Sequence, residues 1–209
     1  MKIYLKQILF FVVFTLCVTL LKGNNYISNP TSLFITSKTG IGFTPSDNDG
    51  DGMFLAIYGL GVSSHASKFL NLRAEFNIVN SCGWKSPERL DGDIKFTSTI
   101  YLTNIFLDFY RDKIIRPYAG LGYGYGPNKC YFVKWGGENS GKIIPLKTIQ
   151  SSMVQLSTGM SFTITEKLIG DLGINIVEFD SSGWSEELGE VSLSNGQVHF
   201  LFSLRYTLF

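Results

Sequence analysis

The chain has 209 residues, of which 17% are charged and 14% aromatic, with 22 glycines and a formal net charge of +1. Few charges and many aromatics exclude a disordered chain, the small net charge gives no electrostatic basis for binding nucleic acid, and three cysteines are too few for a disulfide scaffold. A globular domain or a membrane protein remains, and a helical membrane bundle is excluded because no apolar run of roughly 18 residues follows residue 22.

The first 23 residues have the pattern of a secretory signal peptide. Lys2 and Lys6 precede an apolar run at 8–21, and Gly23 follows that run. The run is short for a membrane-spanning helix, which disfavours the alternative of an uncleaved anchor, and we expect cleavage after Gly23. Removing residues 1–23 takes away three lysines and no acid, so 18 basic and 17 acidic residues become 15 and 17, and the mature formal charge is −2.

The rest of the chain alternates apolar and polar residues with period two, which is typical of strands. In the clearest case, 70–78, Leu72 and Phe76 share one face while Arg73 and Glu75 share the other. Strands are predicted at 33–43, 53–62, 70–78, 94–109, 116–126, 153–164, 168–177 and 197–208. Each is about the length, roughly 9–11 residues or slightly more, that a tilted strand needs to cross hydrocarbon.

The connections between these strands alternate in length. The long ones are 44–52, 80–93, 127–148 and 181–193, and the short ones are 63–68, 110–115 and 165–167. Outer-membrane barrels have short periplasmic turns, longer extracellular loops and an even number of strands, whereas a soluble sandwich has no reason to sort its loops in this way. We therefore predict an all-β fold, an eight-stranded antiparallel up-and-down transmembrane β-barrel over 33–209, after a short periplasmic segment at 24–32.

The apolar face of each strand is expected to contact lipid and the polar face to fill the lumen. Side chains just fill the interior of an eight-stranded barrel, so no wide water channel is expected. Buried charges need partners, and we expect these to pair across the lumen. The polar residues assigned to the lumen are Arg73, Glu75, Lys95, Asp108, Asp171, Asn175, His199 and Arg205. A soluble lipocalin-like barrel is the alternative, which the aromatic character of the opposite faces disfavours.

Four glycines alternate along one predicted strand. They are Gly120, Gly122, Gly124 and Gly126, all assigned to the lumen side. Glycine weakens a strand unless something must approach closely. We expect this ladder to leave room for large inward side chains such as Tyr118 or Arg205.

The stretch 103–126 resembles a hairpin of the outer-membrane protein A-like and Opa-like eight-stranded barrels, in which an Asn…Asp-Phe strand end precedes a turn and Pro-Tyr-x-Gly-x-Gly-x-Gly. The matching residues are Asn104, Asp108, Phe109, Pro117, Tyr118, Gly120, Gly122 and Gly124. The resemblance adds Asn104 to the lumen set. It implies an integral protein of a Gram-negative-type outer membrane, in contact with outer-membrane lipid and lipopolysaccharide.

The C-terminus resembles the assembly signal that the barrel-insertion machinery of this family reads. Phe209 is the terminal residue, as in the family, while Tyr206 stands fourth from the end where the family prefers third. The resemblance therefore implies the insertion machinery as a partner.

Two further sites are hypotheses. Asp47, Asp49 and Asp51 match the first half of a calcium loop, but Tyr58 stands where the bidentate Glu belongs, so an acidic surface loop is the favoured interpretation. Cys82 and Cys130 fall in neighbouring predicted long loops, and we predict a disulfide between them in an oxidising compartment.

We expect a barrel without an enzymatic centre or cofactor that displays four extracellular loops, as a surface antigen or adhesin-like protein with a structural role in the envelope. Trp84, Trp135 and Trp184 lie in different predicted loops, where they either contact a host or surface ligand or pack the loops together. A small porin-like channel is one alternative. A lipid A-modifying enzyme is another, disfavoured because His199 is assigned to the lumen.

Overall fold

The computed structural model describes residues 31–44, 52–67, 69–86, 92–110, 113–135, 141–148, 151–180, 182–186, 189–192 and 195–208. The strands within them are β1 (Ser32–Phe43), β2 (Gly52–His65), β3 (Leu70–Lys85), β4 (Gly92–Phe109), β5 (Ile115–Gly126), β6 (Asn128–Lys134), β7 (Ile143–Thr148), β8 (Ser151–Thr163), β9 (Leu168–Asp180), β10 (Ser182–Ser185), β11 (Gly189–Ser192) and β12 (Asn195–Thr207). No helix long and apolar enough to cross a membrane occurs in these ranges.

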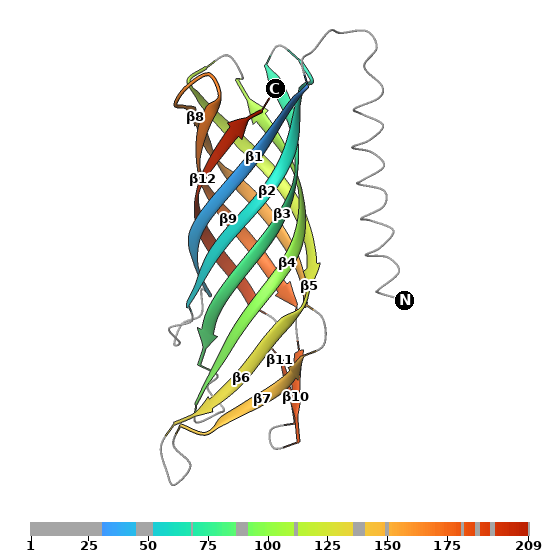
Figure 1. The fold of residues 1–209 in the computed structure, drawn as a ribbon, viewed down its shortest axis with the longest axis vertical. Helices are drawn as coiled ribbons and strands as arrows, with labels where there is room; N and C mark the ends of the chain where they lie inside the picture. Colours follow the sequence, from blue (N-terminus) through green and yellow to red (C-terminus); the bar gives the residue numbers. More distant parts are fainter. Residues whose placement is uncertain are drawn as a thin grey trace, which may run out of the picture.

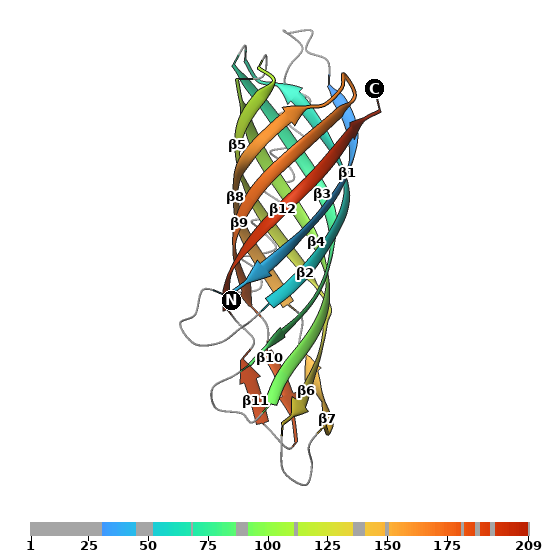
Figure 2. The same cartoon turned by 90° about the vertical axis from the view of Figure 1, so that its left-hand side faces the viewer.

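Eight of these strands close into a barrel, which confirms the predicted fold (Figures 1 and 2). Antiparallel pairing runs from β1 through β2, β3, β4, β5, β8, β9 and β12, and β12 pairs back onto β1. The closing pair runs from Phe34 opposite Thr207 to Phe43 opposite Val198. Every edge of these eight strands within the barrel wall is thereby paired.

The connections sort to the two ends as predicted. The short turns between β2 and β3, β4 and β5, and β8 and β9 lie at the upper end in Figure 1, where β1 starts and β12 ends. The strand ends that the longer connections join lie at the lower end. We call these the turn end and the loop end of the barrel.

The outer face of the barrel carries an apolar band, because successive side chains of a strand point to opposite faces. Its exposed members include Ile35, Ile41, Phe54, Leu60, Phe76, Ile78, Leu107, Leu121, Val154, Leu156, Leu172, Ile174, Ile176, Phe200, Phe202 and Leu204. Tyr101 and Tyr125, directly opposite each other on β4 and β5, border the band towards the loop end, and Phe109 and Tyr206 border it towards the turn end. Aromatic girdles at both borders are typical of transmembrane barrels.

The prediction of long loops is wrong in part for 80–93, 127–148 and 181–193, because these connections contain strands. β3 continues to Lys85 and β4 begins at Gly92, so much of the predicted connection 80–93 is a strand pair. β6 follows β5 and pairs with the start of β4, and β7, β10 and β11 extend the sheet from there. The strands beyond the girdle form a loop-end sheet that projects from the barrel (Figures 1 and 2).

The inner face of the loop-end sheet explains why it is ordered. Ile94, Phe132, Ile144 and Leu146 are all buried on that face, in one apolar cluster with Phe96 and residues of the barrel. The alternation of buried and exposed residues in β6 continues that of β5. Burial of this apolar face stabilises β6 and β7, although both strands are too short to span a membrane.

Candidate functional site

The barrel interior divides into two halves of different chemistry. The half towards the turn end holds the charged residues, and the half towards the loop end holds mostly apolar side chains, together with the buried Gln197 and His199. The apolar residues include Leu55, Ile57, Val79, Ile100, Leu102, Met153 and Val177, each at most 6% exposed. The prediction that the polar face of every strand fills the lumen is therefore wrong for part of the loop-end half, where Gln197 and His199 of β12 are nevertheless buried. In β2 both faces are apolar, so alternation alone did not show which face is inside.

Arg73 is the centre of the first charge cluster. Its side chain is buried on β3, and its two Nη atoms donate to Glu75 Oε1 at 2.5 Å and to Asp108 Oδ1 at 3.0 Å. Lys38 of β1 donates to the second oxygen of Glu75, and Asn77 Nδ2 donates to the same oxygen at 3.2 Å. Two cations and two carboxylates therefore balance in this cluster, as buried charges require.

Arg205 and Asp171 form the second cluster, between β12 and β9. The Arg205 Nε and Nη2 atoms donate to Asp171 Oδ2 and Oδ1 at 2.9 and 2.7 Å. Ser203 Oγ donates to Asp171 Oδ2 at 2.6 Å, and Ser161 Oγ accepts from Arg205 Nη2 at 2.9 Å. Side-chain contacts of the first cluster thus link β1, β3 and β4, and those of the second cluster link β8, β9 and β12. These contacts add to the backbone pairing of the strands.

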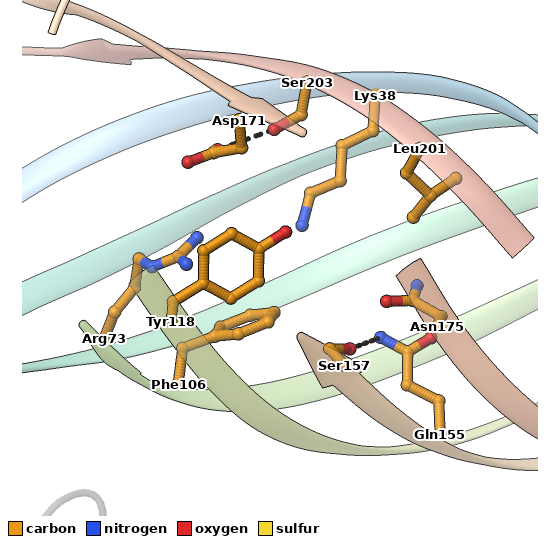
Figure 3. A pocket seen from close by; sticks show the side chains of 10 residues that line it. All are labelled: Lys38, Arg73, Phe106, Tyr118, Gln155, Ser157, Asp171, Asn175, Leu201 and Ser203. Atoms are coloured by element: carbon orange, nitrogen blue, oxygen red, sulfur yellow. Dashed lines mark hydrogen bonds between the residues drawn. The ribbon is translucent and has the colours of Figure 1, made fainter. Parts of the chain in front are cut away.

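Two aromatic rings lie between the clusters (Figure 3). The Arg73 guanidinium lies 4.1 Å from the centre of the Phe106 ring and 5.2 Å from that of Tyr118, and the two rings meet edge to face. Beside them is a cavity of about 20 Å³ lined by Lys38, Arg73, Phe106, Tyr118, Gln155, Ser157, Asp171, Asn175, Leu201 and Ser203. A cavity of this size holds about one water molecule.

The structure places eight of the nine residues assigned to the lumen inside the barrel. They are Arg73, Glu75, Asn104, Asp108, Asp171, Asn175, His199 and Arg205, all buried. The prediction for Lys95 is wrong: it is exposed on the outer face of β4, one residue out of phase with Ile94 and Phe96, which are buried. Since inward residues of β4 have even numbers from Ile94 to Asp108, the assignment of Lys95 broke the alternation.

The glycine ladder faces inward, and all four glycines are buried. A Cβ atom would overlap the Phe106 ring at Gly120, the Asn104 carboxamide at Gly122 and the Thr99 carbonyl oxygen at Gly126, and would lie 2.6 Å from Ile100 at Gly124. The side chains that use this room thus come from β4 and not from Arg205. Tyr118 instead lies over Gly159 and Gly173 of β8 and β9.

The predicted disulfide is wrong in this structure, where both cysteines are free. Cys82 is exposed on the outer face of β3, opposite Thr97, whereas Cys130 is buried on the inner face of β6, opposite Phe96. The two thiols therefore lie on opposite faces of one sheet. Burial raises the pKa of the Cys130 thiol to about 12.

Some predicted sites fall outside the described residues. These are the signal peptide with most of 24–32, the calcium-loop residues Asp47, Asp49 and Asp51, and the terminal Phe209. Tyr206, the other residue of the assembly signal, is exposed at the turn-end border of the apolar band. Trp84 and Trp135 are exposed beyond the loop-end girdle, and Trp184 belongs to β10.

Neither Lys38 nor Gln155 was named among the lumen residues, although the alternation of 153–164 puts Gln155 on the polar face of its strand. Lys38 is the only charged residue of β1, and a lysine in the middle of a transmembrane strand has to face the lumen. Gln155 Nε2 donates to Asn104 Oδ1 at 3.0 Å and to Ser157 Oγ at 2.9 Å. Gln155 stands between the apolar Val154 and Leu156 on β8, and this alternation indicates that Gln155 faces the interior.

No protein-family model and no curated protein matches the chain. Among solved structures it is similar to neisserial surface protein A, at 13% identity and a TM-score of 0.49 over 85% of this chain and 97% of that one. It is also similar to OprG from Pseudomonas aeruginosa (15%, 0.47, covering 84% and 96%) and to the attachment invasion locus protein Ail of Yersinia pestis (12%, 0.44, covering 87% and 100%). The chain has the eight-stranded barrel fold that the resemblance at 103–126 implies, as its own strand pairing establishes.

Proposed function

We propose that this protein is an outer-membrane surface protein, whose barrel holds the loop-end sheet outside the cell as a contact surface. It would act as a surface antigen or adhesin-like protein and contribute to the structure of the envelope. The turn end would face the periplasm.

The observation that carries the proposal is the loop-end sheet itself. Beyond the girdle at Tyr101 and Tyr125, β4 and the strands paired to it continue as a sheet with one buried apolar face. A barrel that only spans a membrane does not require this sheet. A rigid scaffold that positions exposed side chains is, however, what a binding surface needs.

The packing of the interior supports this function over the alternative of a small pore. The described interior is filled by the two charge clusters at one end and mostly by apolar side chains at the other. The cavity between them has room for about one water molecule. A continuous file of water through the barrel would have to displace both the charge clusters and the apolar side chains.

The surroundings of His199 favour a binding role over lipid modification. Its Nε2 atom lies 2.9 Å from Gln197 Oε1, and the side chain is 2% exposed, inside the barrel. A group that acts on a lipid has to reach the lipid-facing side.

Epitope insertion tests the orientation. Gly141 is exposed at the β6–β7 turn with open space around it, and Glu166 is exposed in the β8–β9 turn. A tag after Gly141 is expected to bind antibody on intact cells, and a tag after Glu166 only on permeabilised cells. The reverse result, or labelling of both only after permeabilisation, would overturn the proposal.

Adherence tests the role of the sheet. Cells that display the whole protein are expected to adhere to a target surface more than cells that display a variant with 128–147 replaced by a short turn. The variant must retain the unboiled electrophoretic mobility of a folded barrel. Equal adherence across a panel of host-cell and abiotic surfaces would contradict a contact function for the loop-end sheet.

A further inference from the structure

We propose that the cavity between the two charge clusters binds one small monovalent anion of the halide class, such as chloride. The groups that hold the ion are the Lys38 ammonium, the Tyr118 and Ser157 hydroxyls and the Asn175 carboxamide, which we call the donor set. They come from β1, β5, β8 and β9, so a bound ion joins four strands across the lumen. The inference does not depend on the proposed function.

The donor set converges on one space inside the barrel. All four residues line the same cavity of about 20 Å³, and each is at most 9% exposed. In Figure 3 the Lys38 ammonium and the Tyr118 hydroxyl point towards each other, and Asn175 and Ser157 lie across the same space. Burying polar groups around one cavity costs free energy unless an occupant completes their hydrogen bonds.

The neutral members of the donor set have hydrogens to donate into the cavity. Among the residues that the structure describes, the Tyr118 hydroxyl and the Asn175 carboxamide have no hydrogen-bond partner. Ser157 Oγ accepts from Gln155 Nε2 at 2.9 Å, so its own hydrogen is available to donate. With the Lys38 ammonium, the cavity has more donors than a water molecule has lone pairs, whereas an anion accepts from all of them.

The charges around the cavity favour an anion over a cation. Lys38 and Arg73 both line it, and Lys38 keeps donor hydrogens besides the one that it gives to Glu75. Asp171 is the carboxylate among the lining residues, and both of its oxygens accept from Arg205. A cation in the cavity would therefore meet an ammonium group without a carboxylate left to balance it.

Arg116 supplies a cation that has no carboxylate partner in the described interior. It stands on β5 two residues before Tyr118 on the same inner face, about 7 Å towards the turn end. Its Nη2 atom donates to Thr163 Oγ1 at 3.2 Å, while its Nε atom is buried without a partner. In the described turn-end half, the cations therefore exceed the carboxylates by one, and one bound monovalent anion restores neutrality. The cations are Lys38, Arg73, Arg116 and Arg205, and the carboxylates are Glu75, Asp108 and Asp171.

Urea unfolding in lipid vesicles tests the proposal, with sodium chloride exchanged for sodium gluconate at constant ionic strength. Gluconate is too large for a cavity of about 20 Å³. For one site, the unfolding equilibrium constant is expected to fall in proportion to the chloride concentration once that concentration exceeds the dissociation constant.

Tyr118→Phe is the test variant, because it removes one donor and keeps the ring. It is expected to weaken chloride binding roughly tenfold or more, which is what a hydrogen bond to a charged group contributes. Tyr125→Phe is the matched control, since it removes an exposed hydroxyl from the outer face of the same strand, and is expected to bind chloride as the wild type does.

Crystals grown in sodium bromide locate the ion by its anomalous scattering, and a peak is expected between Lys38 Nζ, Tyr118 Oη and the Asn175 side chain. Asn175→Asp places a carboxylate in the donor set and is expected to lose both the peak and the chloride dependence. The absence of a peak in the wild type, or equal stability in chloride and gluconate, would overturn the inference and assign the cavity to water. A chloride dependence that survives unchanged in both Tyr118→Phe and Asn175→Asp would place the anion elsewhere and overturn it as well.

Discussion

Arg205 and Asp171 form a two-point ion pair inside the barrel, with Nε and Nη2 of the arginine 2.9 and 2.7 Å from the two carboxylate oxygens. The planar guanidinium matches the carboxylate in this geometry, and both side chains are buried. The pair joins β12 to β9 close to the seam where β12 closes the barrel onto β1.

Replacement of Asp171 by Asn is expected to destabilise the folded barrel by about 3 kcal/mol or more, because it leaves the Arg205 charge buried without its partner. Urea unfolding in lipid vesicles measures the loss. Glu178→Gln is the matched control, an exposed acid on the same strand, and should change the unfolding free energy by less than about 0.5 kcal/mol. Similar small effects for both variants would contradict a structural role for the ion pair.

The Arg73 cluster predicts a rescue. Glu75→Gln leaves Lys38 and Arg73 with Asp108 as their remaining carboxylate in the cluster, so a loss of about 3 kcal/mol is expected. Adding Lys38→Met restores the charge balance. The double variant is expected to regain at least about 1 kcal/mol relative to Glu75→Gln, as coupled neighbours do in double-mutant cycles. Strictly additive losses in urea unfolding would show that Lys38 and Glu75 act independently.

Glycine substitutions test the close packing of β5 on β4. Gly126→Ala places a Cβ against the Thr99 carbonyl oxygen, which as backbone cannot turn away, and is expected to cost about 1–3 kcal/mol. Gly196→Ala on β12 is the control, because a Cβ there has no atom within 4 Å. If the midpoint of urea unfolding is the same for both variants, the packing described for the glycine ladder is wrong.

The two cysteines are expected to differ in reactivity. A maleimide at pH 7 should modify Cys82 in the folded protein and spare Cys130, which is 2% exposed. Because burial raises the pKa of the Cys130 thiol to about 12, its reactive thiolate stays scarce below that pH, and raising the pH from 7 to 9 should not expose it to reaction. For protein prepared without residues 1–23, and hence without Cys17, mass spectrometry then gives one adduct before unfolding and two after unfolding. If neither cysteine reacts with maleimide until the protein is reduced, the two cysteines form the predicted disulfide.

The spans and the closure were predictable because period-two alternation and the sorting of connections by length both follow from crossing a lipid bilayer. Most interior polar residues were predictable for the same reason, since Arg73 and Asp171 occupy the polar face of strands whose other face is apolar. The assignment of Lys95 failed only because it did not follow the phase set by Asp108 on the same strand.

The loop-end half was not predictable from alternation. In β2, Leu55 and Ile57 are buried while Phe54 and Tyr58 are exposed, so two apolar faces gave no indication of which was inside. The loop-end sheet was missed because Phe132 and Ile144 sit in strands too short to span a membrane. These short segments form strands because their apolar side chains are buried in a common cluster, which the sequence of one segment alone does not show.

The most direct test of the central claim, a closed and packed transmembrane barrel, is electrophoresis of the protein refolded in lipid vesicles, loaded with and without boiling. A barrel closed by pairing of β1 with β12 resists the detergent until it is heated, so the unboiled protein is predicted to migrate at a different position from the boiled protein. A single position under both conditions would contradict the closed barrel.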